Sequence, residues 1–242
     1  MNLIDKLITK SLKILFLGKI LETKEEAFSK LKPQQEYILN YIGENSKTAE
    51  DELLAFFQYF SLIPKYSISI KPSQFQNNPW LIEHLASKTD NIWIDAEDYS
   101  EGDKQLGLVL GLKKISTNVG LTIQLKSPDW LSDLHVCLTE NIRIRLCKGA
   151  YKQKDKNKGE HQLYSDAVGA VNLCEERGKS ELLEIATMRD SNFVLLAAKH
   201  KLTLQILYGW HKKFQDYPYN TRIYIPFGTR WLPYIKRRLW GR

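Results

Sequence analysis

Polar residues stand at the ends of short apolar segments along most of the chain, and together their types could support chemistry. The set contains several cations and one clear acid, Asp95. Buried charges must be paired with one another or neutralised by a ligand. A cluster of this composition therefore suits an anionic cofactor and a substrate that carries a carboxylate. The residues are Lys71, Asp95, Glu97, Gln124, Arg145, Lys148, Thr187, Gln205 and Tyr224.

The C-terminal segment reads YIPFGTRWLPYIKRRLWGR and holds a second group of candidates. Tyr234 lies three and four residues before Arg237 and Arg238, and helical residues at these spacings share a face. The two arginines could clamp one carboxylate from two directions. The alternative is that they only occupy the C-terminus of a helix, where cations are favoured. The pattern alone leaves both interpretations open.

The sequence gives no sign of a metal site. Its five histidines lie far apart, with no pair at the spacing that zinc sites use. The three cysteines, Cys137, Cys147 and Cys174, fit no metal motif, and an odd number suits no disulfide framework. We expect them to be buried free thiols.

Eight short apolar segments are predicted to be the strands that position the polar residues. Most are rich in Ile, Leu and Val, as expected for strands covered on both faces. Helical patterns lie between them, and strands that alternate with helices indicate parallel pairing. The predicted strands are Ile14–Leu17, Tyr66–Ile70, Asn91–Ile94, Leu121–Leu125, Ile142–Leu146, Leu182–Ala186, Thr203–Leu207 and Arg222–Pro226.

Helix ends are marked by a proline at the first position, an aspartate before it or a glycine after the last turn. The connection from Lys19 to Lys65 is long enough for two helices, one of them over Thr48–Ile63. Three more helices are predicted: one that begins at Pro79 after Asn78, Ser191–His200 capped by Asp190, and Ser165–Arg177 ending at Gly178.

Eight such units could close into a β/α barrel, which typically takes about 250 residues, close to the 242 of this chain. An open doubly wound sheet is the alternative, but it usually carries a glycine-rich phosphate loop after its first strand, and none is present. No low-complexity linker or internal repeat is visible. We therefore expect one α/β domain over residues 1–242, a TIM-like (βα)8 barrel whose strands carry function at their C-terminal ends.

The net charge of +7 raises the question of an anionic partner. The basic residues are scattered apart from Lys152–Lys158 and Lys236–Arg242, so a solvated surface is favoured over a nucleic-acid interface.

Ile14–Leu17 is too short for the core of a signal peptide, so a cytoplasmic location is the expectation. Core packing is the simpler explanation of the amphipathic stretch Leu3–Leu12, and peripheral membrane contact is the alternative.

Several runs resemble the proline dehydrogenase family, in order along nearly the whole chain. The KGAY run and the closing RRL helix together are fairly specific. The runs are ILFLGKILETKEEA (Ile14–Ala27), which resembles the family's first strand and following helix, SIKPSQ (Ser69–Gln74), IDAED (Ile94–Asp98), RIRLCKGAY (Arg143–Tyr151), EIAT (Glu184–Thr187), QILYG (Gln205–Gly209) and RIYIPFGTRWLPYIKRRL (Arg222–Leu239).

The resemblance implies a distorted barrel with the C-terminal helix over its mouth and a non-covalent flavin, FAD, with FMN as the alternative. It implies an oxidoreductase that moves a hydride from the carbon next to the proline nitrogen to flavin N5. The product would be pyrroline-5-carboxylate, in the first step of proline catabolism. A quinone or another acceptor would then take the electrons.

The resemblance also implies a substrate site. Arg237 and Arg238 would bind the substrate carboxylate with help from Lys71, and Asp95 would form a hydrogen bond near it. The residues around the five-membered ring would be Tyr224, Tyr234 and Leu207.

The implied flavin site centres on Arg145, which would lie at flavin N5. Arginine stays charged at any working pH, so its effect on the flavin would be constant. Gly149 and Ala150 would let the backbone approach the cofactor closely. The implied flavin contacts are Gln124, Lys148, Gly149, Ala150, Thr187 and Gln205.

Four positions depart from the family pattern. The family usually has D-x-L-G-E in its first strand, and its glutamate pairs with one of the two arginines over the substrate. Phe16 and Lys19 fall on those two acids, and the lysine reverses the charge. Met188 replaces a histidine that contacts the cofactor, and Lys152 replaces a tryptophan.

Three functions are consistent with these residues. Oxidation of proline is favoured, and Tyr224 favours it over a hydroxylated ring because the site has no spare room for the hydroxyl. Oxidation of another cyclic or N-methylated imino acid is the first alternative. A non-catalytic, flavin-free barrel is the second, and Lys19 is the main feature that favours it.

Overall fold

The computed structural model forms a closed barrel of eight parallel strands. It describes residues 21–42, 66–75, 78–87, 91–97, 102–116, 118–150, 158–188, 190–210, 214, 217–228, 231–232 and 234. Each strand pairs with the next along the chain, and β8 pairs with β1 to close the barrel. The strands are β1 (Glu36–Tyr41), β2 (Tyr66–Ile70), β3 (Ile92–Ile94), β4 (Val119–Gln124), β5 (Arg143–Cys147), β6 (Leu183–Thr187), β7 (Thr203–Leu207) and β8 (Thr221–Phe227).

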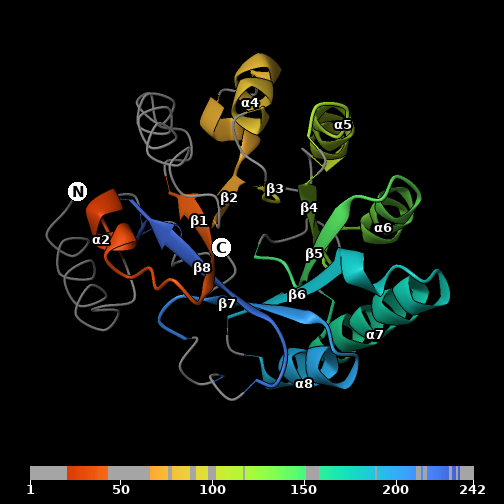
Figure 1. Cartoon of the computed structure of the whole chain (residues 1–242). Helices are drawn as coiled ribbons and strands as arrows, with labels where there is room; N and C mark the ends of the chain where they lie inside the picture. Colours follow the sequence, from red (N-terminus) through yellow and green to blue (C-terminus); the bar gives the residue numbers. More distant parts are fainter. Residues whose placement is uncertain are drawn as a thin grey trace, which may run out of the picture.

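Helices surround the strands on the outside of the barrel (Figure 1). Figure 1 shows α4 to α8 following one another around the ring, with α2 next to β8. The predicted TIM-like barrel is therefore confirmed. The helices are α2 (Lys24–Phe28), α4 (Pro79–Ala86), α5 (Gly102–Leu112), α6 (Trp130–Thr139), α7 (Glu160–Glu176) and α8 (Ser191–Lys199), with short 3-10 turns η1 (Pro72–Phe75) and η3 (Ser180–Leu182).

The three predicted helix ends are confirmed. Helix α4 begins at Pro79. The Asp190 carboxylate caps α8 by accepting the Asn192 N–H at 2.9 Å. Gly178 follows α7 with φ +63°, a backbone conformation that glycine adopts without strain. Helix α7 itself begins at Glu160, five residues earlier than predicted, and Thr48–Ile63 lies outside the described residues.

The first strand differs from the prediction. The barrel closes through β1 at Glu36–Tyr41, so the prediction that Ile14–Leu17 is the first of the eight strands is wrong. β1 also occupies part of the connection that was predicted to hold two helices. The reason is that β1 needs apolar side chains only toward the outer helices, where Tyr37 and Leu39 pack, and it tolerates the polar Asn40 toward the interior.

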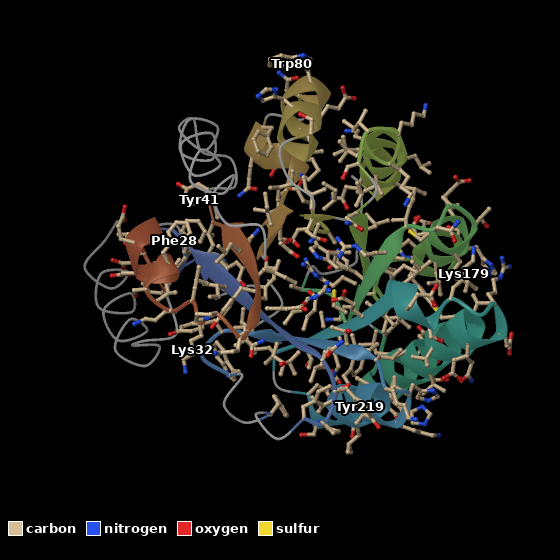
Figure 2. The ribbon with its side chains drawn as sticks, in the orientation of Figure 1. Phe28, Lys32, Tyr41, Trp80, Lys179 and Tyr219 are labelled. Atoms are coloured by element: carbon tan, nitrogen blue, oxygen red, sulfur yellow. The ribbon has the colours of Figure 1, made fainter. Side chains whose placement is uncertain are left out.

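The two faces of the barrel wall bury different kinds of side chain. Strand residues alternate between the two faces. In β3, Ile92 and Ile94 join the large apolar cluster under the helices, while Trp93 belongs to a separate cluster. Polar residues are buried as well, and Figure 2 shows nitrogen and oxygen atoms among the side chains inside the ring of strands. The buried polar and charged residues are Asn40, Ser67, Ser69, Lys71, Gln74, Asp95, Gln105, Gln124, Arg145, Glu184 and Gln205.

Trp93 fills the lower part of the barrel interior and requires a glycine on the next strand. A Cβ atom on Gly120 would lie 2.4 Å from the Trp93 ring. The guanidinium groups of Arg143 and Arg145 lie over the same ring, at 4.6 and 4.7 Å from its centroid. One large ring and two cations therefore occupy part of the interior, whereas branched apolar residues dominate most barrels.

The structure tests the prediction that the three cysteines are buried free thiols. Cys137 and Cys174 are buried free thiols, as predicted, and burial raises the pKa of each to about 12. Cys147, at the end of β5, is only partly buried.

Figure 2 shows Trp80 at the outer tip of α4, where it is 66% exposed. No helix in the described part of the chain is long and apolar enough to cross a membrane.

Candidate active site

Asp95 is the centre of a hydrogen-bonded cluster at the C-terminal ends of the strands. It follows β3 directly and is 5% exposed. Its carboxylate accepts hydrogen bonds from the Ser69 hydroxyl at 2.5 Å, from the Tyr224 hydroxyl at 2.6 Å and from Nη1 of Arg145. Lys71 Nζ lies 3.9 Å from the same carboxylate. Residues from β2, β3, β5 and β8 thus meet at one buried acid.

The electrostatics of this cluster keep Asp95 ionised. Burial alone would raise the pKa of the Asp95 carboxyl. The charges of Arg145 and Lys71 and the hydrogen bonds from Ser69 and Tyr224 outweigh burial and hold the pKa below its ordinary value. Two cations therefore face the one Asp95 carboxylate.

Arg145 is held in place from several directions. Its Nε donates to Gln205 Oε1 at 2.5 Å, and its Nη1 also donates to Ser69 and Thr122, at 2.9 and 3.2 Å. Its guanidinium lies against the Tyr224 ring as well as the Trp93 ring. Its Nη2 is buried and has no hydrogen-bond partner among the described residues. An unpaired donor in such a position can bind an acceptor on a ligand.

Gln124, Gly149 and Ala150 form one connected unit at the ends of β4 and β5. The Gln124 amide donates to the Glu97 carbonyl at 3.0 Å and accepts the Ala150 N–H at 3.2 Å. Gly149 has φ +102°, and a Cβ there would lie 3.0 Å from Gln124 Oε1. Only glycine fits this conformation and this close approach without strain.

Lys148 and Thr187 meet around Asp190 at the ends of β5 and β6. The Lys148 ammonium forms ion pairs with both Glu160 and Asp190. Burial lowers the pKa of Lys148, but its hydrogen bonds and the two carboxylates raise it above the ordinary value. Thr187 Oγ1 accepts the Asp190 N–H at 3.0 Å. The charge of Lys148 is thus already balanced by protein groups.

An apolar wall adjoins the charged cluster. Leu207, Tyr224 and Tyr234 pack in one cluster, and Met188 packs against it. Tyr234 is 1% exposed although it lies in the C-terminal segment, so this part of the segment is packed onto the barrel mouth. The other members of this apolar cluster are Ile38, Ile42, Trp93, Trp210 and Trp231.

The structure brings most of the predicted site residues to one end of the barrel. Lys71, Asp95, Arg145, Gln205 and Tyr224 are linked by direct contacts. Arg237 and Arg238 lie outside the described residues, as do Phe16, Lys19 and Lys152. In the described part of the chain, no group of three or more His, Cys, Asp or Glu side chains could hold a metal ion.

Sequence reasoning missed several residues of this site. Ser69 and Asn40 contact Asp95, the latter through its Nδ2 at 3.4 Å. Glu184 and Trp93 also lie inside the barrel. The signal for Asn40 was a single polar residue within the apolar run YILNYI. Trp93 gave no signal, because a tryptophan between two isoleucines is typical of an apolar strand.

The first strand of the barrel is β1 and not Ile14–Leu17, so the family's first-strand pattern D-x-L-G-E must be looked for after β1. Counted from the end of β1, D-x-L-G-E falls on the sequence Asn40-Tyr41-Ile42-Gly43-Glu44. Its glutamate is then Glu44 and its aspartate is Asn40. The assignment of the two acids to Phe16 and Lys19 is therefore wrong, and the charge reversal attributed to Lys19 disappears.

Comparisons with known proteins found similar sequences but no matching family model. Proline dehydrogenase 1 of Bacillus subtilis (strain 168) is 27% identical over 165 residues, which cover 61% of this chain and 53% of that protein. Proline dehydrogenase 2 of the same strain is 28% identical over 177 residues, 68% of this chain and 58% of that protein. The chain thus spans a little over half the length of these relatives.

The fold has a counterpart among solved structures. The crystal structure of proline utilization A (PutA) from Bdellovibrio bacteriovorus, inactivated by N-propargylglycine, superposes with a TM-score of 0.77 at 18% identity. The superposition covers 98% of this chain and 33% of that one. The chain is therefore similar in sequence to two proline dehydrogenases, and it shares its barrel fold with PutA.

Proposed function

We propose that this chain oxidises L-proline to pyrroline-5-carboxylate with a bound flavin, preferably FAD. The observation that carries the proposal is the buried Asp95 carboxylate, which is bonded to Arg145 and Tyr224 beside an apolar wall at the barrel mouth. The names of the relatives support the same reaction. The implied reaction breaks one C–H bond of the ring, and the nitrogen loses a proton as the C=N bond forms.

The residues present fit a flavin. Gly149, with φ +102° and no side chain, lets the backbone after β5 pack directly against Gln124, which places the Gln124 amide beside Ala150. Arg145 Nη2 is a buried donor without a protein partner, and it can bind a ring nitrogen or oxygen. The bound flavin would supply the hydride acceptor. Gln124, Gly149, Ala150, Thr187 and Gln205 would hold it, with Arg145 at its reactive edge.

Lys148 would have a different role from the one implied by the resemblance. Its ammonium is bound to Glu160 and Asp190, so its charge is not available to a phosphate without breaking these pairs. It joins the ends of β5 and β6 to α7 and α8 instead. Lys148 would therefore stabilise the shape of the flavin site from outside.

The substrate residues would orient and polarise proline. Arg237 and Arg238 would bind its carboxylate, as the resemblance implies, and Lys71 adds positive charge from inside the barrel. Leu207, Tyr224 and Tyr234 provide an apolar surface for the ring. Asp95 is held ionised, so it would act as a fixed negative charge and not as a proton donor.

A different imino acid is the second candidate. Met188 places an apolar thioether against the aromatic cluster, at the position where the family has a histidine. A cyclic or N-methylated imino acid could fit such a pocket. The flavin-free alternative loses its main support, because the acid of the D-x-L-G-E pattern falls on Glu44 and not on Lys19.

The electron acceptor and the membrane are separate proposals. A quinone, or another carrier, would reoxidise the flavin. The stretch Leu3–Leu12, which could contact a membrane surface, lies outside the described residues, so that contact remains a prediction.

The test is a visible spectrum of the purified protein after addition of FAD, followed by L-proline without oxygen. A flavin band that bleaches with proline supports the proposal. A band that persists with proline but bleaches with N-methylglycine, or with a cyclic imino acid other than proline, supports the second candidate. A protein that retains no flavin contradicts both.

A further inference from the structure

A carboxylate that the sequence did not single out lies behind Arg145, on the side away from Asp95. Glu184 belongs to β6 and is 5% exposed. In the barrel register its Cα is the direct partner of Arg145 on β5. The carboxylate nevertheless forms no ion pair with Arg145 and is bound to Gln205 and Arg222.

Gln205 connects Glu184 with Arg145 through the two ends of its amide. Its Oε1 accepts the Arg145 Nε–H at 2.5 Å, and its Nε2 donates to Glu184 Oε2 at 2.6 Å. An amide oxygen only accepts and an amide NH₂ only donates. An amide turned by 180° would direct its NH₂ at the Arg145 N–H and lose both hydrogen bonds.

Glu184 and Arg145 act together on this orientation, because Glu184 Oε2 accepts at one end of the amide and the Arg145 Nε–H donates at the other. The NH₂ of Gln205 must then face Glu184, and the oxygen must face Arg145. Arg222 keeps Glu184 in place through Nη1, at 2.5 Å from Oε1, and its own Nε donates to Glu36 at the same distance. The side chains of Glu36, Arg222, Glu184, Gln205 and Arg145 thus form one continuous hydrogen-bonded chain.

Glu184 also balances the positive charge of the interior. Arg143, Arg145 and Arg222 all lie near it. Burial lowers the pKa of Arg143 to about 10, and Glu184 is the largest of the charges that oppose this shift. The carboxylate therefore has two effects, one on the direction of a hydrogen bond and one on the local charge.

We propose that Glu184 is a positioning residue, which fixes the Arg145 guanidinium toward Asp95 and the barrel mouth by holding in place the Gln205 amide that accepts the Arg145 Nε–H. The consequence for catalysis rests on the proposed function, since it assumes that Arg145 acts at the flavin. The consequence for Arg145 itself does not rest on it, because the hydrogen-bonded chain consists of protein groups alone.

The chain offers a matched pair of variants. Glu184→Gln keeps the size of the side chain but removes its charge and replaces one acceptor oxygen with a donor, so the side chain holds Gln205 and Arg222 less strongly. Glu36→Gln makes the same change in the other carboxylate bound to Arg222. The Glu36 side chain is 57% exposed and does not contact Gln205, so it serves as the control.

The first readout is the exchange of the Arg145 Nε–H with solvent in the flavin-free protein, followed by ¹⁵N NMR and assigned from its loss in Arg145→Lys. We expect exchange to be at least about tenfold faster in Glu184→Gln and unchanged in Glu36→Gln. Gln205→Met should speed exchange equally, and Glu184→Gln should add nothing in that background. If Glu184→Gln fails to fold, Glu184→Asp replaces it, since it keeps the charge but shortens the reach to Gln205.

The second readout is steady-state kinetics of the flavin-loaded protein. We expect Glu184→Gln to lower kcat about tenfold with KM for proline changed less than about twofold. Unchanged exchange in Glu184→Gln, or equal changes in Glu36→Gln, would overturn the proposal. If the wild-type protein does not oxidise proline, the proposed function fails alone, because the exchange measurement still decides the role of Glu184.

Discussion

Asp95 shows how one buried carboxylate can organise an active site. It is surrounded by Arg145, Lys71, Ser69 and Tyr224, which together make its ionised form the stable one. Breaking a buried charge pair by removing one partner is strongly destabilising, since the other charge remains buried and unpaired. The candidate site therefore depends on Asp95 for its stability.

The first prediction concerns Asp95→Asn. We expect this variant to lower the free energy of unfolding at pH 7 by about 3–5 kcal/mol, because Arg145 and Lys71 lose their counter-charge. The pKa of Asp95 lies below its ordinary value of 3.8, so its ionisation stabilises the fold fully above that value. The stabilisation is lost as the pH falls through the folded-state pKa.

Denaturant unfolding of wild type and Asp95→Asn over a pH series measures this difference. The gap between the two should be constant near neutral pH and should shrink below about pH 4. Asp129→Asn is the control, because Asp129 is an exposed carboxylate that makes no capping hydrogen bond. A gap that does not depend on pH would show that Asp95 is not held ionised by its neighbours.

At the scale of elements, neighbouring strands must fit each other inside the barrel. Trp93 on β3 occupies the space above Gly120 on β4, and the two are direct register partners. The sequence of a strand does not show which residue of the neighbouring strand lies opposite it. The pairing of Trp93 with Gly120 could therefore not be predicted. The strands themselves were predicted where apolar runs are bounded by polar residues, as in Tyr66–Ile70 and Thr203–Leu207.

The second prediction tests this packing with two glycines. Gly120→Ala should destabilise the protein by about 1–3 kcal/mol or more, because its Cβ would collide with the Trp93 ring. Gly169→Ala, in α7, should instead stabilise it by about 0.5–1 kcal/mol, since nothing lies within 4 Å of its Cβ. Thermal unfolding compares the two. Equal effects of the same sign would contradict the packing described here.

Helix α8 is anchored to the site by Asp190, which caps the helix and pairs with Lys148. The third prediction separates the two roles. Asp190→Asn keeps an acceptor for the cap and loses the charge, whereas Asp190→Ala loses both. We expect Asp190→Ala to cost about 1 kcal/mol more in unfolding free energy than Asp190→Asn. Identical costs would mean that the cap contributes nothing.

The first strand shows where prediction from sequence failed. Ile14–Leu17 is more uniformly apolar than β1, so it was chosen as the first strand. β1 has polar residues at Glu36 and Asn40, because one faces solvent and the other faces Asp95. A strand whose inner face lines a polar site has too weak an apolar pattern to be recognised by hydrophobicity alone.

At the scale of the whole molecule, the large apolar cluster and the candidate site occupy different parts of the barrel. Apolar residues between strands and helices form the large cluster that holds the fold together. The polar interior carries the candidate site, so its residues are under different physical constraints. The polar residues at strand ends were predictable for this reason, whereas Glu184 was not, because its role depends on contacts across three strands.

Flavin binding should stabilise the whole barrel, because the cofactor would bind only the folded state. The fourth prediction is that FAD at about 100 times its Kd raises the unfolding free energy by about 2.7 kcal/mol. Thermal unfolding with and without FAD measures it. No shift at any FAD concentration would contradict a flavin site in this barrel.

The most direct test of the account is the rate at which L-proline reduces the bound flavin without oxygen, measured by stopped flow. Arg145→Met removes the charge beside Asp95, and Arg143→Met makes the same change in the other arginine that stacks on Trp93. We predict rapid reduction in wild type and Arg143→Met, and reduction at least about 100-fold slower in Arg145→Met. The account would be contradicted if proline did not reduce the flavin bound to the wild-type protein. It would also be contradicted if the flavin were reduced at equal rates in Arg145→Met and Arg143→Met.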